Sequence, residues 1–203
     1  MKIICIGHNY KDHIEEMNAV LPEKPVFFLK PDSSILQTGK DFYLPDFSND
    51  IQYELEVIVK VHRLGKHIDK KFAHRYYSHI GVGIDVTARD LQRECKEKGL
   101  PWEIAKSFDG SAMLSEWIPI EEIEDLNNIN FKLMLNDEVV QFGNTKNMVF
   151  NIDEIIEYVS KFLTLKIGDI IFTGTPKGVG KLEIGDELKA FIEERELLNI
   201  KIK

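Results

Sequence analysis

The chain has 203 residues, of which 43% are hydrophobic and 30% are charged, and it contains 7 prolines and no low-complexity tract. This composition argues against extended disorder, and the length predicts one globular domain over residues 1–203. The net charge of −8 and the lack of a Lys/Arg stripe exclude the usual signature of nucleic-acid binding, so an anionic ligand would need a local site.

The cysteines and the apolar runs indicate the compartment. Cys5 and Cys95 are far apart in the sequence, which predicts neither a disulfide framework nor a thiolate zinc site and is typical of a reduced compartment. The first apolar run, residues 2–7, is too short for a signal-peptide core, and no run is long enough to span a membrane. We therefore expect a cytoplasmic protein without a membrane partner.

The first fifty residues combine short β segments with loops. Residues 2–7 predict an apolar strand, and Asn9 is placed to cap a short helix over residues 10–17. Two prolines then favour extended chain, and residues 26–31 predict a second strand. The Gly, Asp, Ser and Asn content of residues 32–50 predicts a loop.

The middle of the chain predicts two apolar strands and a helix. The strands cover residues 51–59 and residues 80–86, and residues 70–78 between them are weakly helical. Residues 88–98 predict a longer helix, which Gly99 closes.

From residue 117 onward the pattern is mostly β. An amphipathic helix over residues 152–163 interrupts it, with apolar side chains at helical spacing. The predicted fold class is therefore mixed α/β and β-dominated, with a few helices packed outside. The predicted strands of this half cover residues 131–135, 139–142, 169–173, 186–192 and 197–202, and the first two form a hairpin through residues 136–138.

Three acidic side chains lie in the two central strands. Glu54 and Glu56 are one residue apart, so both project from the same face of a strand. A hard divalent cation would relieve the repulsion between them. The alternative is an ordinary half-buried strand, in which Gln52, Glu54, Glu56 and Lys60 face water. Asp85 favours the metal site, because a carboxylate in so apolar a stretch is rarely buried without a partner.

The glycine-rich run of residues 174–181 differs from a phosphate-binding loop. Five residues rather than four separate Gly174 from Gly180, and Leu182 stands where Ser or Thr would hold magnesium. The simplest interpretation is a glycine turn between strands. Its threonine hydroxyls and backbone N–H groups also suit an anion.

Several other polar residues have both an ordinary and a catalytic interpretation. By default Lys106 is a surface lysine and His13 is a surface or core histidine. Glu16, one helical turn from His13, could fix the tautomer of the imidazole and make it a better general base, on a short helix that could act as a mobile lid. Arg89 and Gln92 share a face of the longer helix, where they form either a solvated surface or a carboxylate-binding pair.

One ordered set of motifs runs through the chain. It comprises Asn9-Tyr10 with His13 and Glu16, then Lys30-Pro31, Glu54-Leu55-Glu56, residues 85–92, residues 106–109, Gly168-Asp169 and residues 173–180. This set resembles the fumarylacetoacetate hydrolase family, over nearly the whole chain and without a large N-terminal extension. The nearest resemblance is to the small acylpyruvase and oxaloacetate decarboxylase branch, whose Thr-Ala-Arg-Asp and Gly-Leu-Pro-Trp runs occur at residues 87–90 and 99–102.

The resemblance implies a fold, a metal and a substrate class. The fold would be the family's β-roll with a few peripheral helices, usually in a homodimer. The metal would be Mg²⁺ or Mn²⁺, with Ca²⁺ as a further ion that the site could hold in a crystal, and its ligands would be Glu54, Glu56 and Asp85. The substrate would be a small 2-oxo acid.

The resemblance also implies roles for the other residues. The catalytic residues would be His13, Glu16 and Lys106, and the substrate-binding residues Lys30, Arg89, Gln92 and Thr175. His13 and Glu16 match a dyad that activates water in hydrolytic members, and Lys106 would neutralise charge on the substrate oxygen. One departure is that the family commonly has Arg-Asn-Tyr before the lid, where this chain has His8-Asn9-Tyr10. The role that this arginine has in substrate binding or lid closure in other members therefore cannot be carried over to His8.

Together these features predict a metal-dependent hydrolase that cleaves acylpyruvate-type 1,3-diketo acids into pyruvate and a carboxylic acid. The 2-oxo acid would chelate the metal through its carboxylate and adjacent carbonyl. The metal would then stabilise the enolate left by C3–C4 cleavage, after activated water attacks the distal carbonyl. The alternatives on the same site are oxaloacetate decarboxylation, keto–enol tautomerisation, or isomerisation of 2-hydroxyhepta-2,4-diene-1,7-dioate. A third alternative is a 2-oxo acid-binding protein without turnover.

Overall fold

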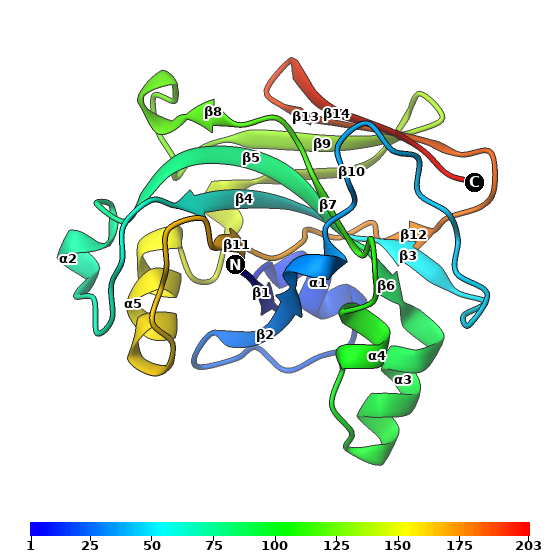
Figure 1. The fold of residues 1–203 in the computed structure, drawn as a ribbon, viewed down its shortest axis with the longest axis horizontal. Helices are drawn as coiled ribbons and strands as arrows, with labels where there is room; N and C mark the ends of the chain where they lie inside the picture. Colours follow the sequence, from blue (N-terminus) through cyan, green and yellow to red (C-terminus); the bar gives the residue numbers. More distant parts are fainter.

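A curved, mostly antiparallel sheet forms the centre of the computed structural model, which describes residues 1–203 (Figure 1). Its strands are β1 (Lys2–Gly7), β2 (Val26–Pro31), β4 (Leu55–Val61), β5 (Tyr77–Asp85), β7 (Ala112–Leu114), β8 (Ile118–Pro119) and β11 (Ile170–Phe172). The order is β2-β1-β11-β4-β5-β7, with β8 beside β5. Only β1 and β11 are parallel neighbours. β4 and β5 are almost wholly buried, because other elements cover both of their faces.

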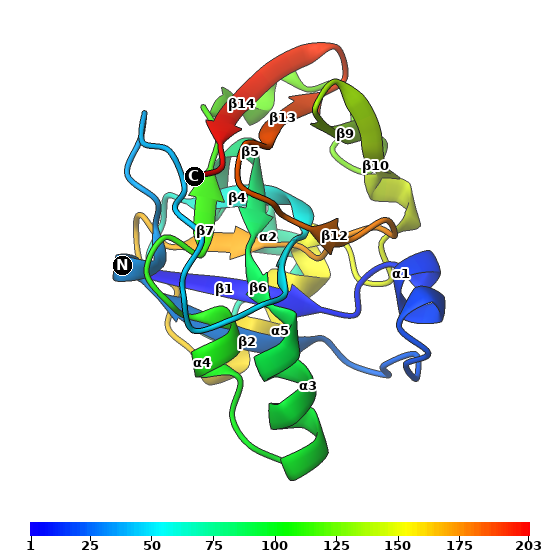
Figure 2. The same cartoon turned by 90° about the vertical axis from the view of Figure 1, so that its right-hand side faces the viewer.

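A second sheet of four antiparallel strands packs on the middle of the first. Its strands are β9 (Asn130–Leu135), β10 (Glu138–Asn144), β13 (Glu187–Ile192) and β14 (Arg195–Lys201), in the order β10-β9-β13-β14. Phe131 and Leu188 of this sheet share one hydrophobic core with Val57 and Val82 of the first. Figure 2 shows the two sheets curling around this interior. The predicted hairpin is confirmed, with a two-residue turn in which Asn136 and Asp137 have positive φ values.

A small third sheet lies at the end of β4 and β5. It contains β3 (Ile51–Tyr53), β6 (Thr87–Ala88) and β12 (Gly180–Lys181), in the order β12-β3-β6. β3 leads into β4, and β6 follows β5 directly, so the first two strands extend the central pair. β12 brings the glycine-rich run against β3, which makes this run a loop between strands, as the simplest interpretation predicted.

Five α-helices lie outside the sheets. They are α1 (Lys11–Glu16), α2 (Lys70–Ala73), α3 (Arg89–Lys98), α4 (Glu103–Lys106) and α5 (Ile152–Phe162), and short 3-10 helices cover Asp32–Ser34, Ile120–Glu122 and Thr145–Asn147. α2 and α5 pack together at one end of the molecule, and α3 and α4 pack together at the other (Figure 1). A capping box between Asn151 and Glu154 starts α5. None of the helices has the length and apolar character that a membrane crossing requires.

The structure corrects the prediction for Asn9. It does not cap a helix, because α1 begins after Tyr10 and has no side-chain cap. Instead the buried Asn9 side chain donates to the carbonyls of Thr173 at 2.7 Å and Phe150 at 3.0 Å. These long-range contacts tie the start of α1 to the segment after β11 and to the segment before α5.

Two further predictions are corrected in the middle of the chain. The weak helix over residues 70–78 is only the single turn of α2, because Tyr77 already pairs with Val61 in the central sheet. The strand over residues 51–59 is interrupted at Glu54, where the chain leaves β3 and enters β4.

Candidate active site

The three predicted metal ligands converge at one end of β4 and β5. Glu54 occupies the break between β3 and β4, Glu56 lies in β4, and Asp85 ends β5. The Asp85 N–H donates to the Glu54 carbonyl at 2.9 Å, which aligns the two segments. Carboxylate oxygens from all three residues lie within 4.8 Å of one another. The residues are 6%, 2% and 1% exposed, so the alternative in which the glutamates face water is wrong.

Three cationic side chains surround these carboxylates. Arg89 Nη2 lies 2.5 Å from Glu54 Oε1, and Lys106 Nζ lies 2.8 Å from both Glu54 Oε2 and Asp85 Oδ2. Lys30 Nζ lies 2.8 Å from Asp85 Oδ1. The formal charges of the three carboxylates and the three cations therefore cancel within one buried cluster.

Glu54 and Glu56 differ in their electrostatic surroundings. Burial raises the pKa of Glu54, but the charges of Lys106 and Arg89 outweigh burial and hold this pKa below its usual range. Glu56 has no cation within ion-pair distance and accepts a hydrogen bond from Gly174 N at 2.5 Å. Burial and the neighbouring carboxylates raise the pKa of Glu56 well above its usual value. A further cation beside Glu56 would relieve this repulsion.

These residues fit a divalent cation. Carboxylate oxygens are the hard ligands that Mg²⁺ and Mn²⁺ prefer, and three converge here on one small volume. The structure therefore brings the three predicted ligands, Glu54, Glu56 and Asp85, together as a site suited to a divalent cation. These three carboxylates and the three cations Lys30, Arg89 and Lys106 are called the floor below.

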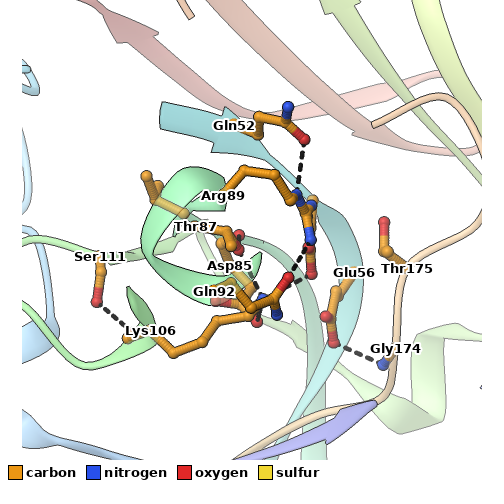
Figure 3. Close-up of polar contacts among 12 residues, drawn as sticks. Gln52, Glu56, Asp85, Thr87, Arg89, Gln92, Lys106, Ser111, Gly174 and Thr175 are labelled. Carbon is orange, nitrogen blue, oxygen red and sulfur yellow. Dashed lines mark hydrogen bonds and ion pairs between the residues drawn. The ribbon is translucent and has the colours of Figure 1, made fainter. Parts of the chain in front are cut away.

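Five of the six floor residues, all except Lys30, line a narrow cavity of about 30 Å³ that is partly open to solvent. Arg89, Gln92 and Thr175 line it, as the resemblance implied. Gln92 Oε1 accepts a hydrogen bond from Arg89 Nη1 at 2.6 Å, so α3 presents both side chains as one unit (Figure 3). Both are buried, which excludes a solvated helix surface.

The two lysines of the floor lie at different depths. Lys106 lines the cavity and donates to Thr87 Oγ1 at 2.6 Å, so its interpretation as a surface lysine is wrong. Burial lowers the pKa of Lys106, but Asp85 and a neighbouring glutamate outweigh burial and raise it, so the ammonium stays charged. Lys30 is fully buried behind Asp85 and does not line the cavity. A hydrogen bond to Ser111 Oγ at 2.9 Å fixes its ammonium, and the ion pair with Asp85 in turn orients that carboxylate. Contact between Lys30 and the substrate stays a prediction.

The helix α1 closes one side of the cavity. His13 lines the cavity, and its Nδ1 lies 2.9 Å from Glu16 Oε2, as the spacing predicted. The other oxygen, Glu16 Oε1, accepts a hydrogen bond from Gly178 N at 2.9 Å. This pairing occupies Nδ1 and leaves Nε2 of His13 available to a ligand. We call α1 with this pair the lid helix.

His8 and Lys96 also line the cavity. His8 has φ 56°, a left-handed backbone conformation, and its Nδ1 is buried without a hydrogen-bond partner. Burial and the charge of Lys96 lower the pKa of His8, which keeps the imidazole neutral.

Sequence reasoning missed Gln141, which supports the site from β10. Its Oε1 accepts from Leu55 N at 2.8 Å, and its Nε2 donates to Thr175 Oγ1 and Pro176 O, both at 2.9 Å. Gln141 thereby links the glutamate strand to the loop that carries Thr175. In the sequence, Gln141 is marked only as a polar residue within an apolar strand. Many half-exposed strands have such a residue, so the pattern did not single out Gln141.

Known proteins match both the sequence and the fold. Residues 2–203 match the family model described as fumarylacetoacetate (FAA) hydrolase C-terminal. The chain is 42% identical over 201 residues to the mitochondrial oxaloacetate tautomerase FAHD1 of Bos taurus, which covers 99% of this chain and 90% of that protein. It is 39% identical over 192 residues to the mitochondrial oxaloacetate decarboxylase of Dictyostelium discoideum, covering 94% of this chain and 88% of that protein.

A solved structure has the same arrangement of elements. The fumarylpyruvate hydrolase of Pseudomonas aeruginosa, in complex with Mn²⁺ and pyruvate, superposes with a TM-score of 0.94 at 30% identity, covering 100% of this chain and 89% of that chain. The predicted β-rich roll is therefore confirmed. With a family model that spans nearly every residue and relatives that align from end to end, the chain belongs to the fumarylacetoacetate hydrolase family.

Proposed function

We propose that this protein is a divalent-metal-dependent enzyme that interconverts the keto and enol forms of oxaloacetate. One observation carries the proposal: Lys106 and His13 face the same cavity, one as a buried cation and the other with a free ring nitrogen. Similarity to an oxaloacetate tautomerase and an oxaloacetate decarboxylase supports this substrate. It favours the tautomerase and decarboxylase alternative over acylpyruvate hydrolysis, the main expectation from the sequence.

Keto–enol exchange moves one proton between C3 and the C2 oxygen and needs no water. The floor carboxylates would hold Mg²⁺ or Mn²⁺, which supplies a Lewis acid for the substrate oxygens when bound. Lys106 stabilises negative charge on the C2 oxygen while the proton is in transit. His13, oriented by Glu16, takes the proton from C3 through Nε2 and delivers it to the C2 oxygen, and the reverse transfer regenerates the keto form.

Arg89 is the residue best placed to orient the substrate carboxylate. Its Nε donates to Gln52 Oε1 at 2.8 Å, and Gln92 and Glu54 hold its other two nitrogens. A guanidinium fixed in this way loses little freedom when it binds a carboxylate.

The test compares three reactions with and without Mg²⁺ or Mn²⁺. They are the loss of enol absorbance from oxaloacetate, the release of pyruvate from oxaloacetate, and the cleavage of acetylpyruvate. We expect metal-dependent tautomerisation to be the fastest. If acetylpyruvate is cleaved while oxaloacetate remains unchanged, the proposal is wrong and the chain is a hydrolase.

A specific observation favours hydrolysis of an acylpyruvate as a second candidate. The hydrogen bond between His13 and Glu16 is the geometry that a water-activating pair requires. The same floor would then stabilise the pyruvate enolate after C3–C4 cleavage. The homodimer, the cytoplasmic location and the single domain remain predictions.

A further inference from the structure

Lys96 differs from the other cations around the cavity. Arg89 and Lys106 each contact a floor carboxylate, and His13 contacts Glu16. Lys96 lines the same cavity, but no carboxylate lies within 4.0 Å of its ammonium. The cavity wall therefore carries one positive charge without an internal partner.

The position of Lys96 follows from α3. Arg89, Gln92 and Lys96 follow one another at intervals of three and four residues, so they share one face of the helix. Lys96 lies about 6 Å further along the helix axis than Gln92. Its ammonium lies 5.3 Å from the ring centroid of Trp102, which also lines the cavity. This contact holds the charge at the cavity wall.

His8 provides a second polar group near Lys96. The charge of Lys96, after burial, is the largest influence that lowers the pKa of His8, so the two groups are electrostatic neighbours. The buried Nδ1 of His8 has no hydrogen-bond partner within the protein. A buried polar nitrogen of this kind gains a hydrogen bond when a ligand supplies the partner.

The charge of the site favours a dianion. The floor carboxylates and the floor cations cancel formally, so a divalent cation leaves two positive charges and Lys96 adds a third. A monocarboxylic 2-oxo acid neutralises one of these charges, and a dicarboxylic 2-oxo acid neutralises two.

We propose that Lys96 and His8 form a subsite for the second, distal carboxylate of the substrate and so select dicarboxylic over monocarboxylic 2-oxo acids. This inference rests on the proposed function, because it places the 2-oxo end of the substrate at the floor. Lys96 supplies the charge that distinguishes a carboxylate from a neutral group. His8 supplies a hydrogen bond that either kind of group can use.

The test uses oxaloacetate and its 4-methyl ester, which has the same 2-oxo acid end but no distal charge. Their dissociation constants from the Mn²⁺-loaded protein are measured by water-proton relaxation, which does not require turnover. We expect the wild type to bind oxaloacetate about tenfold more tightly than the ester. Lys96→Met should bring this ratio close to one by weakening oxaloacetate alone.

Two further variants make the test specific. Lys98→Met is the matched control, because Lys98 lies on the same helix, contacts Glu94 at 2.6 Å and does not line the cavity, so the ratio should remain that of the wild type. His8→Asn tolerates the left-handed backbone and should weaken both ligands alike, which leaves the ratio unchanged.

Each outcome decides one of the two proposals. A wild type without preference for the dianion, or a Lys96→Met variant that keeps the preference, overturns the subsite even if oxaloacetate is tautomerised. A preference that Lys96→Met abolishes supports the subsite even if the wild type does not tautomerise oxaloacetate, and in that case only the proposed reaction is lost.

Discussion

The floor and the lid helix face the same cavity, but they are held in place very differently. Every floor residue is buried, and ion pairs join Glu54 and Asp85 to cations from β2, α3 and α4. The lid helix has only six residues, too few to be stable alone, and Glu16 latches it to Gly178 by one hydrogen bond. The floor is therefore the rigid part of the site, and the lid helix is the part most easily changed.

This difference suggests that the floor and the lid helix have separate roles in catalysis. A tautomerase, a decarboxylase and a fumarylpyruvate hydrolase are all similar to this chain over nearly its whole length. All three reactions pass through a 2-oxo acid enolate, which Lys106 and a metal held by the floor carboxylates would stabilise. They differ in where a proton or a water molecule must be handled. We therefore expect floor substitutions to abolish every reaction and lid substitutions to separate them.

The largest effect is expected from Asp85→Asn. Loss of one of three carboxylates should abolish tight metal binding and lower all metal-dependent turnover by more than about 1000-fold. Mn²⁺ binding is measured from the signal of free Mn²⁺ in electron paramagnetic resonance, and turnover from enol absorbance. Glu94→Gln, an exposed change on α3, is the control. Unchanged Mn²⁺ affinity in Asp85→Asn would remove Asp85 from the ligand set.

Lys106→Met should separate metal binding from catalysis within the floor. Without this ammonium, the carboxylates lose a competing cation, so Mn²⁺ should bind at least as tightly as in the wild type. Turnover should still fall on the order of 100- to 1000-fold, because charge on the substrate oxygen loses its buried cationic partner. Calorimetric titration with Mn²⁺ and the enol assay measure the two quantities. Loss of both together would mean that Lys106 only shapes the floor.

The sequence predicted the floor carboxylates better than the residues that support them. Strand periodicity is local, so the spacing of Glu54 and Glu56 was enough to place both side chains on one face. The contacts of Lys30 and Gln141 join segments more than 50 residues apart, and no local pattern encodes them. Asn9 shows the opposite error, because a local capping preference predicted a role that long-range backbone contacts replaced.

His13→Ala tests the lid helix. Tautomerisation and any acylpyruvate cleavage should fall about 100-fold, because both need the proton carrier, while oxaloacetate decarboxylation should stay near the wild-type rate. Mn²⁺ affinity and thermal stability should not change, since His13 does not contact the floor carboxylates. His62→Ala, an exposed histidine outside the cavity, is the control. An equal fall in all three rates would mean that His13, like the floor residues, is needed for every reaction, and it would contradict the separate roles of the floor and the lid helix.

The smallest effect is expected in the metal-free protein, from Glu56→Gln. The pKa of Glu56 is raised by burial and by neighbouring carboxylates, so the folded protein retains a proton that the unfolded chain loses near pH 4.5. The free energy of unfolding should therefore fall as the pH rises above 4.5, until the raised pKa is passed. A neutral amide removes this penalty, so Glu56→Gln should stabilise the metal-free protein by about 1–2 kcal/mol near pH 7.

Thermal unfolding at pH 5 and pH 7, with EDTA or with Mn²⁺, measures this effect. The substitution should raise the melting temperature in EDTA, more at pH 7 than at pH 5, because the penalty that it removes grows with pH. In Mn²⁺ the wild type should have the higher melting temperature of the two proteins, because only the wild type has the third carboxylate that binds the ion and gains stability from it. If Glu56→Gln destabilises the protein under both conditions, the hydrogen bond from Gly174 outweighs the charge repulsion, and Glu56 supports the fold independently of the metal.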